Sequence, residues 1–298
     1  MGPAGRLLAA FALLVGAAFA LDALLPPPLE RAGDISALVT DRAGKPLRAF
    51  PTDDGRWRFH GDLDRIDPEF IEALIRVEDK RFRQHNGTDW LGMVRAAVDS
   101  ALSGRVVSGG STITMQTARM LEPRDRNIGS KLIEIVRAHQ IERRLSKDDI
   151  LALYLTLTPY GGNLEGVRAA SWSYFGHEAD RLSDDEIALL IALPQSPEAR
   201  RPDRRPEQAA RARNWVAQKL SNYGVFSEAD VADVAASGVP GRRRDFPDRA
   251  WHGTAKALAS GPRGDVRATL DAGLQAEVER IALTQAELAG AEVQVSAL

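Results

Sequence analysis

Apolar and polar positions along the chain change from a strand-like to a helix-like pattern near residue 67. Residues 35–59 hold two short apolar stretches, 36–40 and 47–50, around a turn-forming Asp-Arg-Ala-Gly-Lys segment, which is typical of a β-hairpin. Asp67 then fits a helix N-cap, and Pro68 fits the first helical position. Apolar residues recur at helical spacing over residues 70–77. The pattern therefore predicts a short hairpin followed by helix.

Further signals extend the helical region to about residue 235. Apolar stripes predict three more helices: 90–102, 113–121 and 131–145. Capping-box spacing predicts two further helix starts: Ser146 with Asp149, and Ser183 with Glu186. The mixed charges of residues 197–213 favour a solvated surface over a functional basic patch. Gly, Pro and Arg in 236–262 indicate a linker, and 268–283 favours a strand followed by a helix.

An apolar run at the amino terminus gives information on export. It follows Arg6, is interrupted by Asp22 and ends at Pro26, so it is short for a membrane span of about 20 residues. Two interpretations stay open. One is an uncleaved anchor oriented by Arg6, and the other is a signal peptide cleaved at an Ala-x-Ala site, residues 18–20. Both would export the chain after residue 28, whereas a buried soluble helix is a weaker third interpretation.

Composition excludes some classes of protein. The 298 residues carry a net charge of −2, which does not suggest a basic nucleic-acid-binding protein. The chain has no cysteine, so disulfides and thiolate metal sites are excluded.

The first candidate site follows the predicted helix at 68–78. Glu78 ends that helix and is followed by Asp79 and His85. Partial negative charge at a helix C-terminus disfavours ionisation of a carboxylate, so we expect a raised pKa for Glu78, as suits a general base. The alternative is an ordinary exposed Glu-Asp pair. The spacing of these three residues fits no standard metal-ligand motif.

The second candidate site is a loop of small residues before the helix at 113–121. Its members are Gly109, Gly110, Ser111 and Thr112. Free backbone N–H groups and the helix dipole at such a place bind phosphate. The residues that add donors or cations for a diphosphate follow: Thr114, Gln116, Arg119, Arg126 and Lys131. The alternative is a flexible loop with an N-cap.

A third candidate, Glu134, lies three residues after Lys131 and so on the same helix face. Taken alone, the two residues would form an ordinary exposed ion pair. Two carboxylates, an anion-binding loop and several cations together indicate glycosyl or phosphoryl chemistry.

These blocks, in this order, resemble the family 51 glycosyltransferase domain of class A penicillin-binding proteins. The matching positions of the first three blocks are Glu78, Asp79, Phe82, His85, Gly87, residues 109–116 except Met115, Lys131 and Glu134. Later blocks match within 146–155, 160–176 and 182–197. The resemblance covers about residues 61–235 and looks most like the penicillin-binding protein 1C type. Departures from the family pattern occur at Ser130, Thr156 and Arg119.

The resemblance implies a mainly α, lysozyme-like glycosyltransferase domain with an N-terminal transmembrane helix and a short β-hairpin. The implied segments are an anchor at 1–28, a hairpin linker at 29–60, the glycosyltransferase domain at 61–235, and a linker with the start of a transpeptidase domain at 236–298. No Ser-x-x-Lys motif follows residue 283, so we expect neither transpeptidase activity nor covalent penicillin binding from this chain.

The implied activity is polymerisation of lipid II into β-1,4 glycan strands with release of undecaprenyl diphosphate. Glu78 would be the base, and Glu134, Lys131 and Arg126 would organise the diphosphate, with a divalent cation (Mg²⁺ or Mn²⁺) as an open expectation and no nucleotide cofactor. By analogy with inverting glycosidases, we expect the two carboxylates to be roughly 6–10 Å apart. Expected partners are lipid II, the growing glycan, the membrane and cell-wall synthesis proteins, but no nucleic acid.

The implied location is the inner membrane, crossed once, with the catalytic domain on the periplasmic side. Two other functions stay open. One is a glycan-cleaving enzyme of the lytic transglycosylase or muramidase kind, and the other is an inactive, membrane-tethered cell-wall scaffold.

Overall fold

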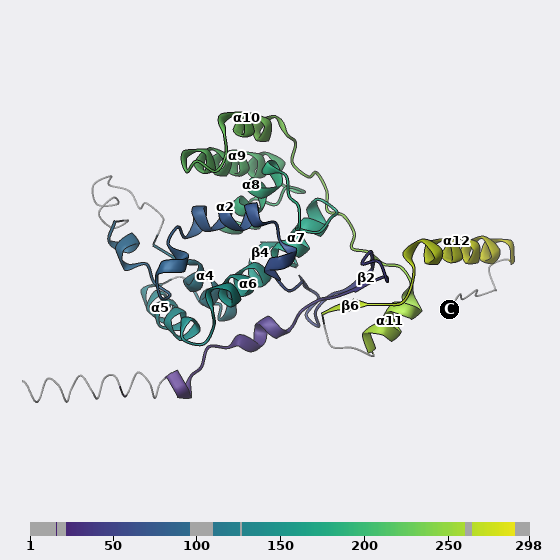
Figure 1. The fold of residues 1–298 in the computed structure, drawn as a ribbon, viewed down its shortest axis with the longest axis horizontal. Helices are drawn as coiled ribbons and strands as arrows, with labels where there is room; N and C mark the ends of the chain where they lie inside the picture. The colour runs from purple at the N-terminus through teal and green to yellow at the C-terminus, as the bar shows by residue number, and fades with distance from the viewer. Residues whose placement is uncertain (1–15, 17–21, 96–109, 126, 260–263, 290–298) are drawn as a thin grey trace, which may run out of the picture. The chain divides into compact units, whose positions relative to one another are not determined.

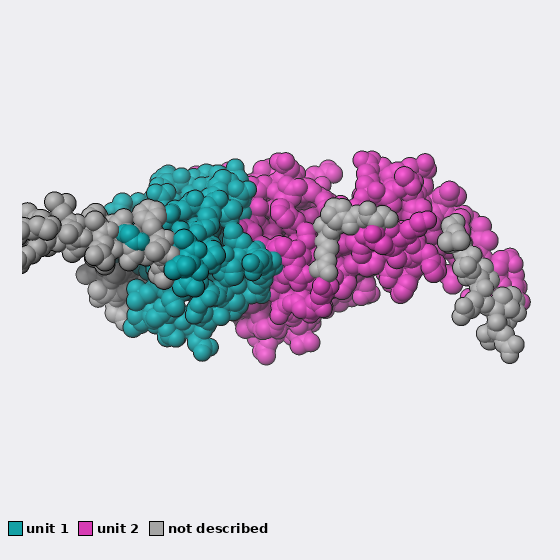
Figure 2. Space-filling view, turned by 90° about the horizontal axis from the view of Figure 1, so that it is seen from below, with its two compact units in different colours: residues 1–31, 81–150 teal, residues 32–80, 151–298 magenta. Residues whose placement is uncertain are grey.

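The computed structural model describes residue 16 and residues 22–95, 110–125, 127–259 and 264–289. The chain divides into two compact units, coloured separately in Figure 2: residues 1–31 with 81–150, and residues 32–80 with 151–298. The described residues are mainly helical, with two small three-stranded sheets (Figure 1). The predicted mainly α class is thus confirmed. The predicted segment boundaries and the lysozyme-like likeness stay predictions.

The predicted hairpin is present in the second unit and gains a third strand. Strand β1 (Ala37–Thr40) pairs antiparallel with β2 (Pro46–Phe50), and β6 (Asp265–Arg267) pairs parallel with β1. Asp41 fixes the turn, because its Oδ1 accepts hydrogen bonds from Ala43 N and Lys45 N, each at 2.8 Å. Its Oδ2 accepts from Ala272 N at 3.0 Å, which ties the start of α12 (Ala272–Ala289) to the hairpin.

A second sheet lies in the same unit in the order β3-β5-β4. Its strands are β3 (Trp57–Arg58), β5 (Leu164–Glu165) and β4 (Pro159–Gly161). Arg58 and Glu165 form a buried ion pair on paired positions, with Arg58 Nη2 2.6 Å from Glu165 Oε2. Helix α7 (Val167–Tyr174) packs against β3 and β5.

The helical part of the second unit packs around α9. Its helices are α2 (Pro68–Glu78), α8 (Asp184–Ala192), α9 (Pro206–Asn222) and α10 (Glu228–Ala236), which lie together in Figure 1. Asp67 caps α2 as predicted, because its side chain accepts from Glu69 N at 2.8 Å. The predicted apolar face of α2 is buried through Phe70, Ala73, Leu74 and Val77. The capping box of Ser183 and Glu186 at the start of α8 is confirmed.

The first unit is built on two helices that pack together, α4 (Ile113–Leu121) and α5 (Ile128–Glu142). Helix α6 (Lys147–Leu157) begins in this unit and continues into the second. Helix α5 begins three residues earlier than predicted because Asn127 is its N-cap, accepting from Ser130 N at 2.8 Å. The short 3-10 helices of the chain are η1 (Leu29–Gly33), η2 (Leu63–Arg65), η3 (Phe82–Gln84) and η4 (Leu193–Gln195).

Of two predicted segments near the ends of the chain, one differs from the structure and the other lies largely outside the described residues. Residues 236–262, predicted as a linker, contain helix α11 (Trp251–Ala259), which packs on β1, β2 and β6. The predicted anchor at residues 1–28 lies largely outside the described residues. Among the helices of the described ranges, none has the length and apolar character needed to cross a membrane.

Candidate active site

A cationic cluster in the first unit joins four of the predicted site residues. Lys131 Nζ lies 3.1 Å from Glu134 Oε2 and donates to Ser111 Oγ at 2.7 Å. Arg119 Nη1 lies 3.8 Å from Glu134 Oε1. Two cations and one carboxylate therefore meet where α4 packs on α5. The Glu134 side chain is only 12% exposed, so its charge is held between the two cations.

The loop before α4 is fixed by its N-cap. Thr112 Oγ1 accepts from Met115 N at 3.1 Å and donates to Gly87 O at 2.6 Å. Gly87 has φ +88, and a Cβ there would lie 2.9 Å from the backbone carbon of Ala138 on α5. Only a residue without a side chain can come this close to the helix backbone. Thr112, the N-cap of α4, and the His-Asn-Gly segment are thus joined next to α5.

A largely buried polar network holds the first turn of α4. Glu142 Oε1 accepts from Thr114 Oγ1 and from Lys147 Nζ, both at 2.6 Å. Lys147 Nζ also donates to His85 O at 2.6 Å and lies 4.5 Å from the centre of the Phe82 ring. The predicted substrate donor Thr114 is therefore fully buried, with its proton directed to Glu142.

Glu78 lies in the second unit, at the last position of α2. Gln195 Nε2 donates to Glu78 Oε1 at 3.4 Å, and Arg200 Nη1 donates to Gln195 Oε1 at 3.1 Å. Lys219 Nζ donates to Val77 O at 3.1 Å, so a cation offsets the negative end of this helix. Burial, and then the negative charge of Glu78, raise the pKa of the Tyr160 phenol.

The comparisons with known proteins decide the family. Residues 43–221 match the sequence model of the family described as Transglycosylase. The chain belongs to the transglycosylase family. It is 41% identical over 270 residues to penicillin-binding protein 1C of Escherichia coli (strain K12), covering 91% of this chain and 35% of that protein. This confirms the predicted resemblance to class A penicillin-binding proteins.

Two further matches are to penicillin-binding proteins of the 1A type. The chain is 40% identical over 171 residues to the protein of Aquifex aeolicus (strain VF5), covering 57% of this chain and 24% of that one. A solved structure of penicillin-binding protein 1A from Haemophilus influenzae overlaps with a TM-score of 0.40 and 17% identity, covering 83% of this chain and 28% of that chain. The chain thus spans about a third or less of the length of these relatives.

The structure places the predicted site residues of the chain in both units. Ser111, Arg119, Lys131 and Glu134 meet in one cluster, with Gly110 just before Ser111 and Gln116 in the first turn of α4. His85 belongs to the same unit, whereas Glu78 and the buried Asp79 belong to the other. Gly109 and Arg126 lie outside the described residues. The Glu78–Glu134 separation and the roles of all these residues stay predictions.

Sequence reasoning did not find Glu142 as part of the site, although it included Lys147 in a family block. In the sequence, Glu142 stands five positions before Lys147. The spacing rules for one helix face do not apply to this pair, because α5 ends at Glu142 and α6 begins at Lys147. Gln195 was missed for a similar reason, since it reaches Glu78 from a distant 3-10 helix.

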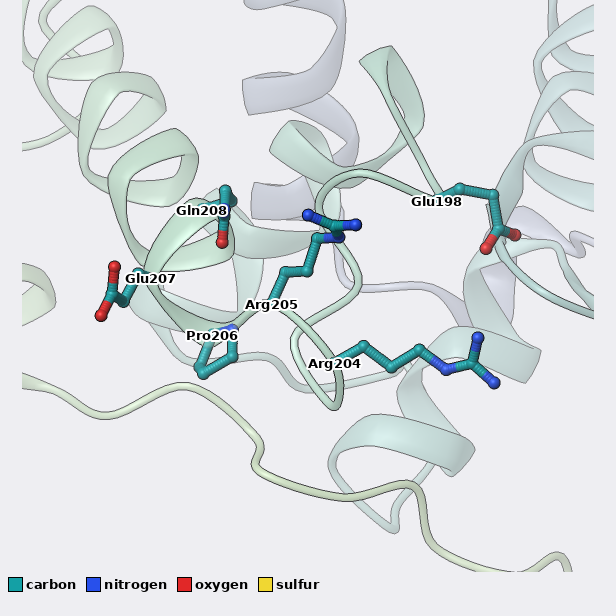
Figure 3. Close-up of a pocket in the computed structure, with 6 residues that line it drawn as sticks. All are labelled: Glu198, Arg204, Arg205, Pro206, Glu207 and Gln208. Atoms are coloured by element: carbon teal, nitrogen blue, oxygen red, sulfur yellow. The ribbon is translucent and has the colours of Figure 1, made fainter.

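A surface pocket of about 550 Å³ lies at the start of α9 (Figure 3) and contains none of the predicted site residues. Its lining is Glu198, Arg204, Arg205, Pro206, Glu207 and Gln208. Two arginines are balanced by two glutamates, and residues 204–208 are exposed. The predicted solvated surface in 197–213 is confirmed for this stretch.

Proposed function

We propose that this transglycosylase polymerises lipid II, a lipid-linked disaccharide-pentapeptide, into β-1,4 glycan strands and releases undecaprenyl diphosphate. The observation that carries the proposal is the cluster of Lys131, Ser111, Arg119 and Glu134 beside the loop before α4. A lysine and an arginine with hydroxyl and backbone donors form a suitable site for a diphosphate. Family membership supplies the glycosyl-transfer chemistry.

In the proposed mechanism, Glu78 accepts the proton of the acceptor sugar's 4-hydroxyl. The hydroxyl oxygen then attacks the anomeric carbon of the donor, the bond from that carbon to the diphosphate oxygen breaks, and the configuration inverts. Space for a bulky nucleophile requires separated carboxylates, so Glu78 and Glu134 would lie roughly 6–10 Å apart in the working enzyme. Gln195 would orient Glu78 through their hydrogen bond.

Lys131, Arg119 and Arg126 would stabilise the charge that develops on the diphosphate. Preorganised cations of this kind contribute strongly to rate when negative charge builds on the leaving group. Glu134 would hold Lys131 and Arg119 in place through their ion pairs. This role explains why a carboxylate lies within a site for an anion.

A divalent cation would bind mainly through the diphosphate itself. In the described part of the chain, no three His, Asp or Glu side chains converge on one point. Mg²⁺ is commonly held by one or two carboxylates and substrate phosphates, and Glu134 is the carboxylate suited to this. Such a cation would add positive charge at the leaving group.

Exposed apolar side chains on the first unit support a place at the membrane surface. Trp90, Leu91 and Val94 are each more than half exposed, as are Ile128, Leu132 and Val136 on α5. Exposed apolar groups on this scale mark contact with lipid or protein. We therefore propose that the amino-terminal segment anchors the protein in the inner membrane, with this unit on the periplasmic side near cell-wall synthesis proteins.

Incubating the detergent-solubilised protein with labelled lipid II tests the proposal. We expect a ladder of glycan polymer on a gel and release of undecaprenyl diphosphate. A parallel reaction on purified cell wall tests for cleavage. Soluble muropeptides without polymer would show a glycan-cleaving enzyme, and no reaction in either assay would indicate a scaffold.

A further inference from the structure

A second pocket of the second unit is lined by arginines that the proposed reaction does not use. It has a volume of about 550 Å³, and residues 242–249 form much of its wall, together with Trp172 of α7. The charged residues that line it are Arg242, Arg243, Arg244, Asp245 and Arg249. Four arginines and one aspartate give the lining a net charge of +3.

The backbone that carries these arginines is fixed in place. Arg244 N donates to Ser173 O at 2.7 Å, and Arg249 N donates to Leu47 O at 2.8 Å. Between them, Ala49 N donates to Pro247 O at 2.9 Å. The segment is thus tied to α7 at one end and to β2 at the other. A site built on such a segment loses little conformational entropy when it binds a ligand.

One arginine of the group is already paired, and three are not. Arg243 Nη1 donates to Asn163 Oδ1 at 3.2 Å, and its Nε lies 3.9 Å from Asp203 Oδ2. The side chains of Arg242, Arg244 and Arg249 form no ion pair or hydrogen bond with any residue of the described ranges. All three residues are exposed at the wall of the pocket, so their guanidinium groups are open to an anion from solvent.

Trp172 adds a hydrogen-bond donor that lacks an acceptor. Its indole Nε1 is buried and has no partner among the residues that the structure describes, although Trp172 lines the same pocket. Buried donors are almost always paired, so one without an acceptor calls for a ligand or another explanation. The guanidinium groups that line the pocket are all donors, and they fit a ligand that only accepts.

We propose that this pocket binds an oxyanion of the phosphate class. Arg242, Arg244 and Arg249 would supply paired N–H donors, which match the geometry of phosphate oxygens, and Trp172 would lie beside the bound anion in the wall of the pocket. The pocket at the start of α9 has the same volume but balanced charges, so it provides a control surface. The proposal stands apart from the polymerase reaction, because none of these residues belongs to the site of Glu78 and Glu134.

The indole N–H resonance of Trp172 gives a direct test. The protein is labelled with ¹⁵N, the Trp172 signal is identified as the one lost in Trp172→Phe, and sodium phosphate is added at constant ionic strength. We expect a saturable shift of this signal among those of the five tryptophans. No shift with either sodium phosphate or the phosphatidylglycerol vesicles described below, or an equal shift with sodium chloride, would overturn the proposal.

Variants separate the pocket from general charge effects. The double variant Arg242→Ala, Arg244→Ala should weaken phosphate binding at least about tenfold, whereas Arg204→Ala at the control pocket should not change it. If the double variant does not fold, Arg249→Gln alone should still weaken binding severalfold. Equal binding by Arg249→Gln and the wild-type protein, or equal weakening by Arg204→Ala, would contradict the assignment.

Two further arms identify the source of the oxyanion. Vesicles of phosphatidylglycerol in phosphatidylcholine test a lipid headgroup, with pure phosphatidylcholine as the control. A Trp172 shift with free phosphate alone indicates a soluble phosphate ligand, and a shift only with phosphatidylglycerol indicates the headgroup. Both results support the oxyanion site. This proposal and the proposed function can fail separately. A protein that shows the Trp172 shift with phosphate but makes no polymer from lipid II would contradict the proposed function and still support this site.

Discussion

Lys131 and Glu134 lie one turn apart on α5, and Lys131 Nζ contacts both Glu134 Oε2 at 3.1 Å and Ser111 Oγ at 2.7 Å. The amine thereby joins α5 to the loop before α4. A diphosphate placed there would meet a lysine whose position is set before the ligand arrives. Preorganised charge of this kind is what electrostatic stabilisation of a leaving group requires.

Replacing Lys131 with alanine should lower the polymerisation rate at least about 100-fold, because the leaving diphosphate loses a fixed cation. The free energy of unfolding should change by less than about 1 kcal/mol, since Lys131 is partly exposed. Initial rates with labelled lipid II and thermal unfolding measure the two effects. Arg211→Ala is the control, because it removes an exposed ion pair with Glu207 on α9, and a wild-type rate in Lys131→Ala would contradict the role.

Glu142→Ala should destabilise the protein by about 3 kcal/mol. The variant leaves Lys147 Nζ and Thr114 Oγ1 without the carboxylate they share at 2.6 Å, and the Glu142 side chain is only 7% exposed. Urea denaturation gives the value. Asp148→Ala is a matched control, since its pair with Arg83 is more than half exposed on both sides and should contribute less than about 1 kcal/mol. An equal decrease in the free energy of unfolding in the two variants would show that the buried network contributes no more than an exposed ion pair.

Thr156→Val should destabilise the protein by about 1–2 kcal/mol. Thr156 Oγ1 accepts from Gly61 N at 2.8 Å in a buried position, and valine would leave that N–H unpaired. Thr156→Ser keeps the hydroxyl and should lose less. Urea denaturation of the two variants measures the difference, and equal stability of Thr156→Val and Thr156→Ser would show that the hydrogen bond contributes nothing.

Acid should remove part of the stability of the second unit through Glu178. Burial disfavours the charged form of Glu178, but its hydrogen bond to Arg168 and the charges of Arg168 and Arg65 outweigh burial and hold its pKa below its ordinary value. Because the pKa of Glu178 is lower in the folded than in the unfolded protein, its contribution to the free energy of unfolding is complete above the unfolded pKa of about 4.3. That contribution is lost as pH falls through the folded pKa.

The comparison of wild type with Glu178→Gln tests this sign. The wild-type protein should be more stable by about 2–3 kcal/mol near neutral pH, and the difference should shrink steadily below about pH 4. Urea denaturation across that range measures it. A difference that stays constant or grows in acid would contradict the assignment.

Local signals explain which parts of the fold could be predicted. The hairpin turn and the start of α2 depend on residues close in sequence, Asp41 with Lys45 and Asp67 with Glu69, and both were predicted correctly. Helix α5 starts at Ile128, three residues before the predicted start, because Asn127 caps it. The prediction rested on the apolar stripe, and a polar N-cap adds nothing to such a stripe. The pairing of β6 with β1 joins residues more than 200 positions apart, a distance that no local pattern can indicate.

The candidate site shows the same division. Lys131 and Glu134 share a helix face, so their contact follows from spacing. The contact of Lys131 with Ser111 depends on the packing of two helices, and the position of Glu142 depends on side chains from two other helices. Such contacts are set by tertiary structure. The family resemblance brought Ser111 and Lys131 together in advance, but it did not indicate Glu142.

Glycan synthesis by Glu78→Gln, measured beside the wild-type protein, tests the central claim most directly. The amide keeps the shape of the carboxylate but cannot accept a proton at working pH, so we expect no polymer from labelled lipid II although the variant unfolds at the same temperature as wild type. The same polymer ladder from Glu78→Gln as from wild type would contradict the assignment of Glu78 as the base.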